Sequence, residues 1–190
     1  MDFEKIKEQA KKVLSEKRFL HSCGVAKRAA ELASIYGQDI ETARKIGIAH
    51  DIAKEMSKEE AIKYITKNNI IFDEIEKKQQ ELWHSKIGAD ISIKKFGFTN
   101  NMAQAILYHT IGNINMNTMD KIIYIADKTD QTRTKINLEE AVKISNNNLD
   151  EGVLYIAKYM IQYSLKKNSL IHPDTINLLN KLIWQKINKK

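Results

Sequence analysis

Apolar residues recur along almost the whole chain with the spacing of amphipathic helices, three or four positions apart. Each such helix carries one apolar stripe that faces the protein interior. The pattern predicts helices over residues 2–17, 21–36, 39–53, 57–67, 84–96, 100–109, 118–127, 138–145, 149–168 and 173–189. Residues 68–72 could form a short strand, but one strand makes no sheet. We therefore expect an all-α bundle of many short helices, without a heptad seam.

Local signals at the helix ends agree with this periodicity. Gly37 and Gly97 stand where helices should stop. Pro173 suits the first turn of the last helix, where its missing N–H costs nothing. Thr118 is a candidate N-cap for a helix over 119–127.

Length and composition place the chain among ordinary globular proteins. With 190 residues, and about 150 residues per domain, one domain over residues 1–190 is expected. Apolar residues make up 43% and charged residues 29%, which excludes a disordered chain. The single cysteine, Cys23, excludes an intramolecular disulfide and a thiolate metal cluster.

No segment predicts a membrane span or a signal peptide. The longest strictly apolar runs, 122–126 and 153–157, are far shorter than the roughly 20 residues of a spanning helix. Residues 1–5 lack the basic-then-apolar order of a secretory signal. We therefore expect a cytoplasmic protein. Its net charge of +7 favours anionic partners in general, without separating nucleotides from nucleic acid.

Polar residues interrupt the inward-facing stripes in an informative way. In the helix predicted over 39–53, the stripe through Ala43 and Ile46 continues to His50, with Asp51 beside it. A buried carboxylate without a partner costs several kcal/mol, so in practice it is paired or bound to a metal. Four more polar residues lie on or next to inward stripes of other helices: His21, His84, His109 and Asp127.

Each of these residues also has an ordinary structural interpretation. A single histidine on an apolar face is more often a core residue than a ligand, and Asp127 alone could form a helix-end hydrogen bond. Taken together, the residues favour a common role. The chain has 5 histidines, and only His172 lies away from an inward-facing stripe. We interpret His172, in a loop beside Pro173, as structural.

Imidazole together with carboxylate is the ligand set of iron, manganese or zinc, whereas magnesium and calcium prefer oxygen alone. The candidates exceed what one four-coordinate zinc needs. They could serve two ions that share a carboxylate, with Asp51 as the natural bridge. Such an ion pair can hold and deprotonate a water and stabilise an in-line displacement at phosphorus.

The ordered series His21, His50-Asp51 and Asp127 resembles the signature of the HD-domain metal-dependent phosphohydrolases. It is most similar to their YqeK-type branch, the symmetrical diadenosine tetraphosphate hydrolases, which release two ADP. The segments that carry the resemblance are 18–22, 49–55, 82–89, 105–112, 119–127 and 171–176. The family usually carries a proline shortly after the aspartate that corresponds to Asp127. This proline is missing here, although Asp130 and Arg133 remain at compatible spacing.

The resemblance implies an HD-type multi-helix bundle with a metal site at its centre, occupied by two transition-metal ions, iron or alternatively manganese. It implies that one ion is held by His21, His50, Asp51 and Asp127, and the other by Asp51, His84 and His109. It gives catalytic roles to Asp51 and Lys54. Substrate contacts are implied for Arg18, His21, Lys54, Thr110, Gly112 and Arg133. The implied reaction is attack of a metal-bound hydroxide on a central phosphorus of diadenosine tetraphosphate.

Other functions stay open at this point. Other HD proteins act on nucleoside monophosphates, deoxynucleoside triphosphates, guanosine alarmones or cyclic dinucleotides, and the metal ligands do not separate these substrates. A basic nucleic-acid-binding module is a third interpretation, based on a lysine-rich first helix and the tail 186–190. It ranks last because aromatic residues are only 7% and stacking platforms need them. We expect a nucleotide as partner, no membrane, and a homodimer as one candidate assembly.

Overall fold

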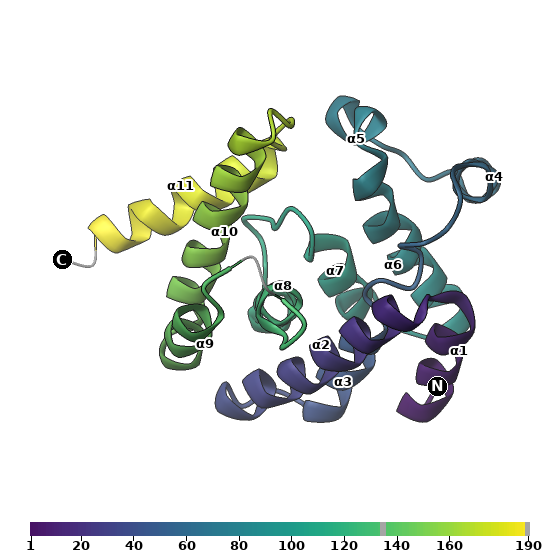
Figure 1. The fold of residues 1–190 in the computed structure, drawn as a ribbon, viewed down its shortest axis with the longest axis horizontal. Coiled ribbons are helices and arrows are strands. Elements are labelled where there is room, and N and C mark those ends of the chain that lie inside the picture. The colour runs from purple at the N-terminus through teal and green to yellow at the C-terminus, as the bar shows by residue number, and fades with distance from the viewer. Residues whose placement is uncertain (134–135, 189–190) are drawn as a thin grey trace.

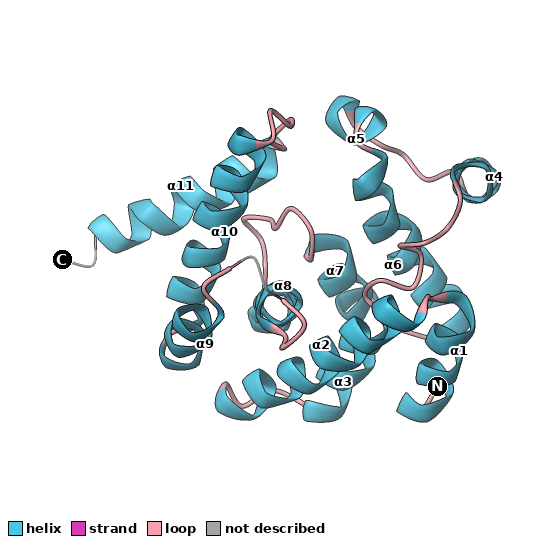
Figure 2. Ribbon diagram, in the orientation of Figure 1, coloured by secondary structure: helices cyan, strands magenta, loops and turns pink. Residues whose placement is uncertain are grey.

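The computed structural model describes residues 1–133 and 136–188, and the regular structure in these ranges is helical throughout (Figures 1 and 2). The elements are α1 (Phe3–Val13), α2 (Glu16–Ile35), α3 (Ile40–Ala49), α4 (Lys58–Asn68), α5 (Glu74–Lys78), the 3-10 helix η1 (Gln80–Leu82), α6 (Trp83–Phe96), α7 (Asn100–Tyr108), α8 (Thr118–Thr129), α9 (Leu138–Asn147), α10 (Leu149–Lys166) and α11 (Pro173–Ile187). The prediction of an all-α protein is confirmed.

Two local predictions at the start and middle of the chain are wrong, and two short elements were missed. The helix predicted over 2–17 ends at Val13, because Leu14 is extended and the side chain of Ser15 accepts the Arg18 N–H as the N-cap of α2. The suggested strand at 68–72 is absent, because Asn68 ends α4 and residues 69–72 form a loop that begins with Asn69 in the left-handed conformation. Between that loop and α6, the short elements α5 and η1 were not predicted.

Two helix ends near the polar residues also differ from the predictions. The helix predicted over 39–53 stops at Ala49, so His50 and the residues after it form a turn. Asn117, not Thr118, caps α8, because Asp120 completes a reciprocal capping box with Asn117. The predicted last residue of the final helix, 189, lies outside the described residues.

The helices near the middle of the chain form the scaffold for the polar residues. Helix α2 packs along α3 and α8, and α7 packs against both α6 and α8 (Figure 1). Gly47 permits the close approach of α2 and α3, because a Cβ there would lie 2.7 Å from Ala26 Cα. Isoleucines from these helices, such as Ile46, Ile106 and Ile123, are buried in the hydrophobic core.

The remaining helices extend from this scaffold on opposite sides in the view of Figure 1. Helices α9, α10 and α11 pack together, with α10 against α8, whereas α4 and α5 lie on the other side beside α6. In the part of the chain that is described, no helix combines the length and the apolar character needed to cross a membrane.

Candidate metal centre

The predicted metal ligands converge from several helices. His21 lies on α2, and His50 and Asp51 lie in the turn directly after α3. His84 lies in the first turn of α6, His109 at the end of α7 and Asp127 in the last turn of α8. We call the set the central cluster; it consists of His21, His50, Asp51, His84, His109 and Asp127. Every member is at most 5% exposed.

Backbone carbonyls aim three of the imidazoles. The Nδ1–H of His50 donates to Gly47 O at 2.7 Å, that of His84 to Glu81 O at 2.7 Å, and that of His109 to Ile106 O at 2.6 Å. A carbonyl only accepts hydrogen bonds, so Nδ1 carries the proton in each ring. In the neutral ring, Nε2 then presents a lone pair, which is the arrangement found in metal-ligating histidines.

Asp51 lies between two groups of imidazoles. Its Oδ2 atom is 3.4 Å from His50 Nε2 and 3.7 Å from His21 Nε2. Its Oδ1 atom is 3.2 Å from His84 Nε2 and 3.6 Å from His109 Nε2. One carboxylate therefore faces both groups, each with a different oxygen.

Asp127 completes the side of the cluster that includes His21. Its Oδ1 atom is 3.1 Å from His21 Nε2 and 3.7 Å from His50 Nε2. These three residues, and likewise His50, Asp51 and His109, bring ligand atoms within 4.8 Å of one another. The spacing is one at which such groups could hold metal ions.

The directions of the protons show that the cluster fits cations. The Nε2 atoms of His84 and His109 are 3.1 Å apart, although both rings have already committed their Nδ1–H to carbonyls. His50 Nε2 is buried and has no hydrogen-bond partner among the described residues. Lone pairs thus face lone pairs and carboxylate oxygens, an arrangement that is costly unless positive charge lies between them.

Electrostatics keeps these groups in their ligand forms. Burial lowers the pKa of His84 and lowers that of His109 to about 4, so both rings are neutral near pH 7. Burial alone would raise the pKa of the Asp51 carboxyl, but His50 and the other facing imidazoles hold it well below its ordinary value. Burial acts likewise on Asp127, whose pKa is held well below the ordinary value chiefly by Lys128.

Asp130, which had no predicted role, supports His21. The Nδ1 atom of His21 is 3.1 Å from Asp130 Oδ2, and Asp130 is 1% exposed. Gly24 leaves room for this carboxylate, because a Cβ there would lie 2.9 Å from Asp130 Oδ1. Burial would lower the pKa of His21, but hydrogen bonds with Asp127 and Asp130 raise it. The available sequence signal was a glycine one turn after a candidate ligand.

Two arginines predicted to bind substrate reach the carboxylates of the centre. Arg18 Nη1 donates to Asp51 Oδ2 at 2.8 Å, and Arg133 Nη2 donates to Asp127 Oδ1. Lys128, which was not predicted, donates to the other oxygen of Asp127. The two arginine side chains remain 29% and 34% exposed, so they form a cationic rim around the buried carboxylates.

Lys54 also lies at the centre, on the side of α6. Its ammonium donates to Glu81 O at 3.2 Å and is 3.3 Å from His84 Nδ1. Burial lowers its pKa, and the negative charge of Asp51 opposes this shift. Lys54, predicted to bind phosphate, thus lies next to His84, which is predicted to bind a metal ion.

Thr110 and Gly112 have different surroundings. Thr110 directly follows His109, and its buried Oγ1 has no hydrogen-bond partner within the described ranges. Gly112 has a φ of +72°, and a Cβ there would lie 2.4 Å from Leu178 Cδ2. Its backbone conformation and its packing under α11 explain this glycine, and its substrate contact stays a prediction.

A second group of potential ligands lies between α5 and α11. We call it the Asp73 cluster; Asp73, Glu76 and His172 bring ligand atoms within 4.8 Å of one another. His172 Nδ1 accepts the Asp174 N–H, so Nε2 carries the proton and donates to Asp73 Oδ2 at 2.6 Å. Glu76 accepts from Lys86 Nζ at 2.5 Å. His172 therefore caps α11, in agreement with its structural interpretation.

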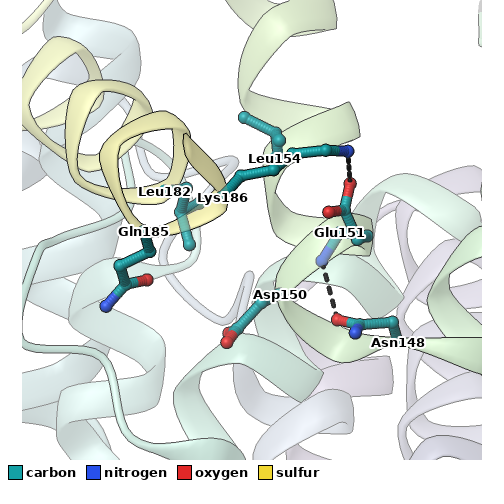
Figure 3. Close-up of a pocket in the computed structure, with 7 residues that line it drawn as sticks. All are labelled: Asn148, Asp150, Glu151, Leu154, Leu182, Gln185 and Lys186. Carbon is teal, nitrogen blue, oxygen red and sulfur yellow. Dashed lines mark hydrogen bonds and ion pairs between the residues drawn. The ribbon is translucent and has the colours of Figure 1, made fainter. Parts of the chain in front are cut away.

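A hollow of about 250 Å³ lies between α10 and α11, away from both clusters (Figure 3). An ion pair of 2.8 Å between Lys186 and Glu151 crosses it, and Leu154 and Leu182 contribute its apolar wall. No member of the central cluster lines this hollow, and we assign it no role in the site.

Fold and central cluster together define an all-helical protein with a buried group of histidines and aspartates that could hold metal ions. The HD domain family matches residues 18–132, a range that contains the whole central cluster. The chain therefore belongs to the HD domain family.

Similar proteins cover nearly the whole chain. It is 32% identical over 174 residues to the "Bis(5'-nucleosyl)-tetraphosphatase, symmetrical" of Bacillus subtilis (strain 168). The matched region covers 91% of this chain and 93% of that protein. It is 31% identical to the protein of the same name from Halalkalibacterium halodurans, over 90% of this chain and 92% of that one. The crystal structure of a "predicted HD superfamily hydrolase involved in NAD metabolism" from Clostridium acetobutylicum has a TM-score of 0.91 and 32% identity, and covers 97% of this chain and 98% of that one.

Proposed function

We propose that this protein is a metal-dependent phosphohydrolase that cleaves diadenosine tetraphosphate symmetrically into two ADP. The observation that carries the proposal is a buried centre in which three imidazoles turn Nε2 lone pairs toward two carboxylates, with a cationic rim around it. Such a centre suits metal ions inside and a polyanion at its edge. The names of the relatives from Bacillus subtilis and Halalkalibacterium halodurans support this substrate.

Two ions, iron or alternatively manganese, account for the donor set. One would be held by His21, His50, Asp51 and Asp127, and the other by Asp51, His84 and His109. Asp51 is the shared ligand because its two oxygens face different imidazoles. When bound, a pair of such ions lowers the pKa of a water and stabilises an in-line displacement at phosphorus.

The residues of the rim bind and orient the phosphate chain. Arg18 and Arg133 now bond to carboxylates of the centre. If the carboxylates held cations instead, the planar guanidinium groups of these arginines would be free to bind phosphate oxygens, which they match with two parallel hydrogen bonds. Lys54 adds a point charge beside His84, where it stabilises negative charge on the departing ADP.

The reaction needs no nucleophilic side chain. Water adds across the central P–O–P linkage, so that its oxygen ends on one ADP and the bridging oxygen leaves with the other. Catalysis at phosphorus depends mainly on positioning and charge stabilisation, which the buried carboxylates and the rim supply. A cytoplasmic location, a homodimer and a single domain over 1–190 stay predictions.

The test is product analysis by anion-exchange chromatography. Protein loaded with iron or manganese is incubated with diadenosine tetraphosphate, beside a sample treated with a chelator. We expect ADP as the sole product, and none in the chelated sample. ATP plus AMP would contradict cleavage at the central phosphorus. No turnover by metal-loaded protein would exclude this substrate, and the other nucleotides cleaved by HD proteins would then be tested.

A further inference from the structure

A cavity of about 340 Å³ adjoins the central cluster between α4, η1 and α6. Its apolar wall comes from Ala53, Met56, Ala61 and Ile87. We infer that this cavity binds one nucleoside of the substrate, with Trp83 as the stacking surface and Gln80 as the contact to the base edge. The inference rests on the proposed function and specifies how that site recognises a nucleotide.

Two residues belong both to the cavity and to the metal centre. His84 lines the cavity, while its Nε2 atom faces Asp51 Oδ1 at 3.2 Å. Lys54 lines the cavity too, with its ammonium 3.3 Å from His84 Nδ1. The cavity therefore begins at the ring of a predicted metal ligand, with a phosphate-binding cation at the boundary.

The chemistry of the substrate demands a nucleoside site at this short range. Symmetrical cleavage leaves only two phosphates between the broken bond and each nucleoside. With one phosphate at the metal centre and the next near Lys54, the nucleoside must lie directly beyond that lysine. The volume falls in the usual range of ligand pockets, about 300–1,000 Å³.

Trp83 is held as a preformed flat surface. Its indole Nε1–H donates to Glu76 O at 2.7 Å, and its ring stacks on Phe72 with centroids 5.6 Å apart and an angle of 26° between the planes. Trp83 lines the cavity and is half-buried. Because its N–H is already committed, what it can offer a ligand is its π system, which suits base stacking worth about 1–3 kcal/mol.

Gln80 supplies an amide at the exposed mouth of the cavity. No hydrogen bond from another described residue engages its side chain. A glutamine amide has an acceptor oxygen and an NH2 group, and these can pair with N6 and N7 of adenine in a bidentate contact. Guanine has an acceptor at O6 where adenine has the N6 amino group, so Gln80 favours adenine.

Intrinsic fluorescence tests the stacking directly, because the chain contains only 2 tryptophans. The second, Trp184, lies on α11 and is 67% exposed. In the Trp184→Phe protein loaded with metal, we expect ADP to quench the remaining indole in a saturable way. Pyrophosphate, which carries no base, should leave the emission unchanged. The matched Trp83→Phe protein should not respond to ADP.

Kinetics supply the second readout. We expect Trp83→Ala to raise the KM for diadenosine tetraphosphate by about 10-fold or more, as the loss of one stacked base predicts. Its metal content should be unchanged, and Trp83→Phe should restore most of the affinity. Trp184→Ala is the matched control and should have the wild-type KM. Gln80→Ala should lose the preference for ADP over GDP as a competing ligand, and Gln185→Ala should keep it.

The outcomes separate this inference from the proposed function. If the wild type cleaves the substrate, but ADP and pyrophosphate affect Trp83 equally and Trp83→Ala keeps its KM, the nucleoside site is wrong and the function stands. If ADP quenches Trp83 and no cleavage occurs, the nucleoside site stands and the function is wrong. If neither quenching nor cleavage occurs, both are wrong.

Discussion

Two clusters in this protein bring imidazole and carboxylate groups within 4.8 Å of one another. In the Asp73 cluster, N–H groups point at the carboxylates: His172 Nε2 donates to Asp73, and Lys86 donates to Glu76. In the central cluster, three rings give their protons to carbonyls behind them and turn lone pairs inward. The two clusters share this ligand spacing. They differ in the direction of the protons, which sets the predicted metal centre apart from a hydrogen-bonded clamp.

The largest expected effect comes from removing the shared carboxylate. Asp51→Ala should abolish metal binding and reduce ADP release by about 10³-fold or more, because the ions supply several kcal/mol of transition-state stabilisation. Metal analysis and the chromatographic assay measure both quantities. The matched variant Asp73→Ala should keep its metal and its activity. Turnover by metal-free Asp51→Ala protein would place the active centre elsewhere.

The second prediction concerns the stability of the metal-free protein at low pH, which tests the neutral state of an imidazole in the central cluster. Folded His109 has a pKa of about 4, whereas the unfolded chain has the ordinary value of about 6.5. Between these values the unfolded state binds more protons, so the free energy of unfolding rises with pH in this window. The stability present above pH 6.5 should therefore fall by about 3 kcal/mol as the pH approaches 4.

Urea unfolding at several pH values, with chelator present, measures this dependence. The control is His109→Asn, which has no imidazole to titrate at this buried position. We expect a shallower slope for this variant between pH 4 and 6.5. Equal slopes in the two proteins would contradict the buried neutral state of His109.

Asp130 offers a test of the support behind one ligand. Asp130→Ala should weaken metal binding by about 10- to 100-fold, the usual effect of losing a partner that orients a metal-bound histidine. Asp130→Asn keeps an acceptor for His21 Nδ1 and should lose less. Metal titration of the three proteins distinguishes these cases, and unchanged affinity in Asp130→Ala would assign Asp130 to packing alone.

The smallest effect is expected in the other cluster. His172→Ala should lower the free energy of unfolding by about 1 kcal/mol, because α11 loses its N-cap. Metal content should not change. His172→Asn retains a capping side chain and should recover most of the loss. Reduced metal content in His172→Ala would show that proton direction does not separate the two clusters.

The sequence predicted most of this arrangement where the helical period was informative. His50 and His109 continue apolar stripes, and the structure buries both at the ends of their helices. Asp130 lies just past α8, outside any stripe, and its partner His21 is 109 positions away. Periodicity gives no signal for a contact of that kind.

Short elements were missed for a related reason. Helix α5 has 5 residues and η1 has 3, too few to show a repeat of 3.6 residues. Asn117 and Thr118 are both competent caps, and the choice between them depends on Asp120, which bonds back to Asn117. The cavity that Trp83 and Gln80 line was therefore not predicted from the sequence.

The carbonyls that aim three of the imidazoles belong to Gly47, Glu81 and Ile106, which are chemically unrelated residues. Every amino acid supplies that oxygen, so the orientation of the rings does not depend on which side chain stands three positions earlier. Substitution of Glu81 or Ile106 would leave this carbonyl in place, whereas Gly47 is needed separately for the close approach of α2 and α3. A shift of a helix end by one residue would turn a ring away from the centre even if every histidine remained.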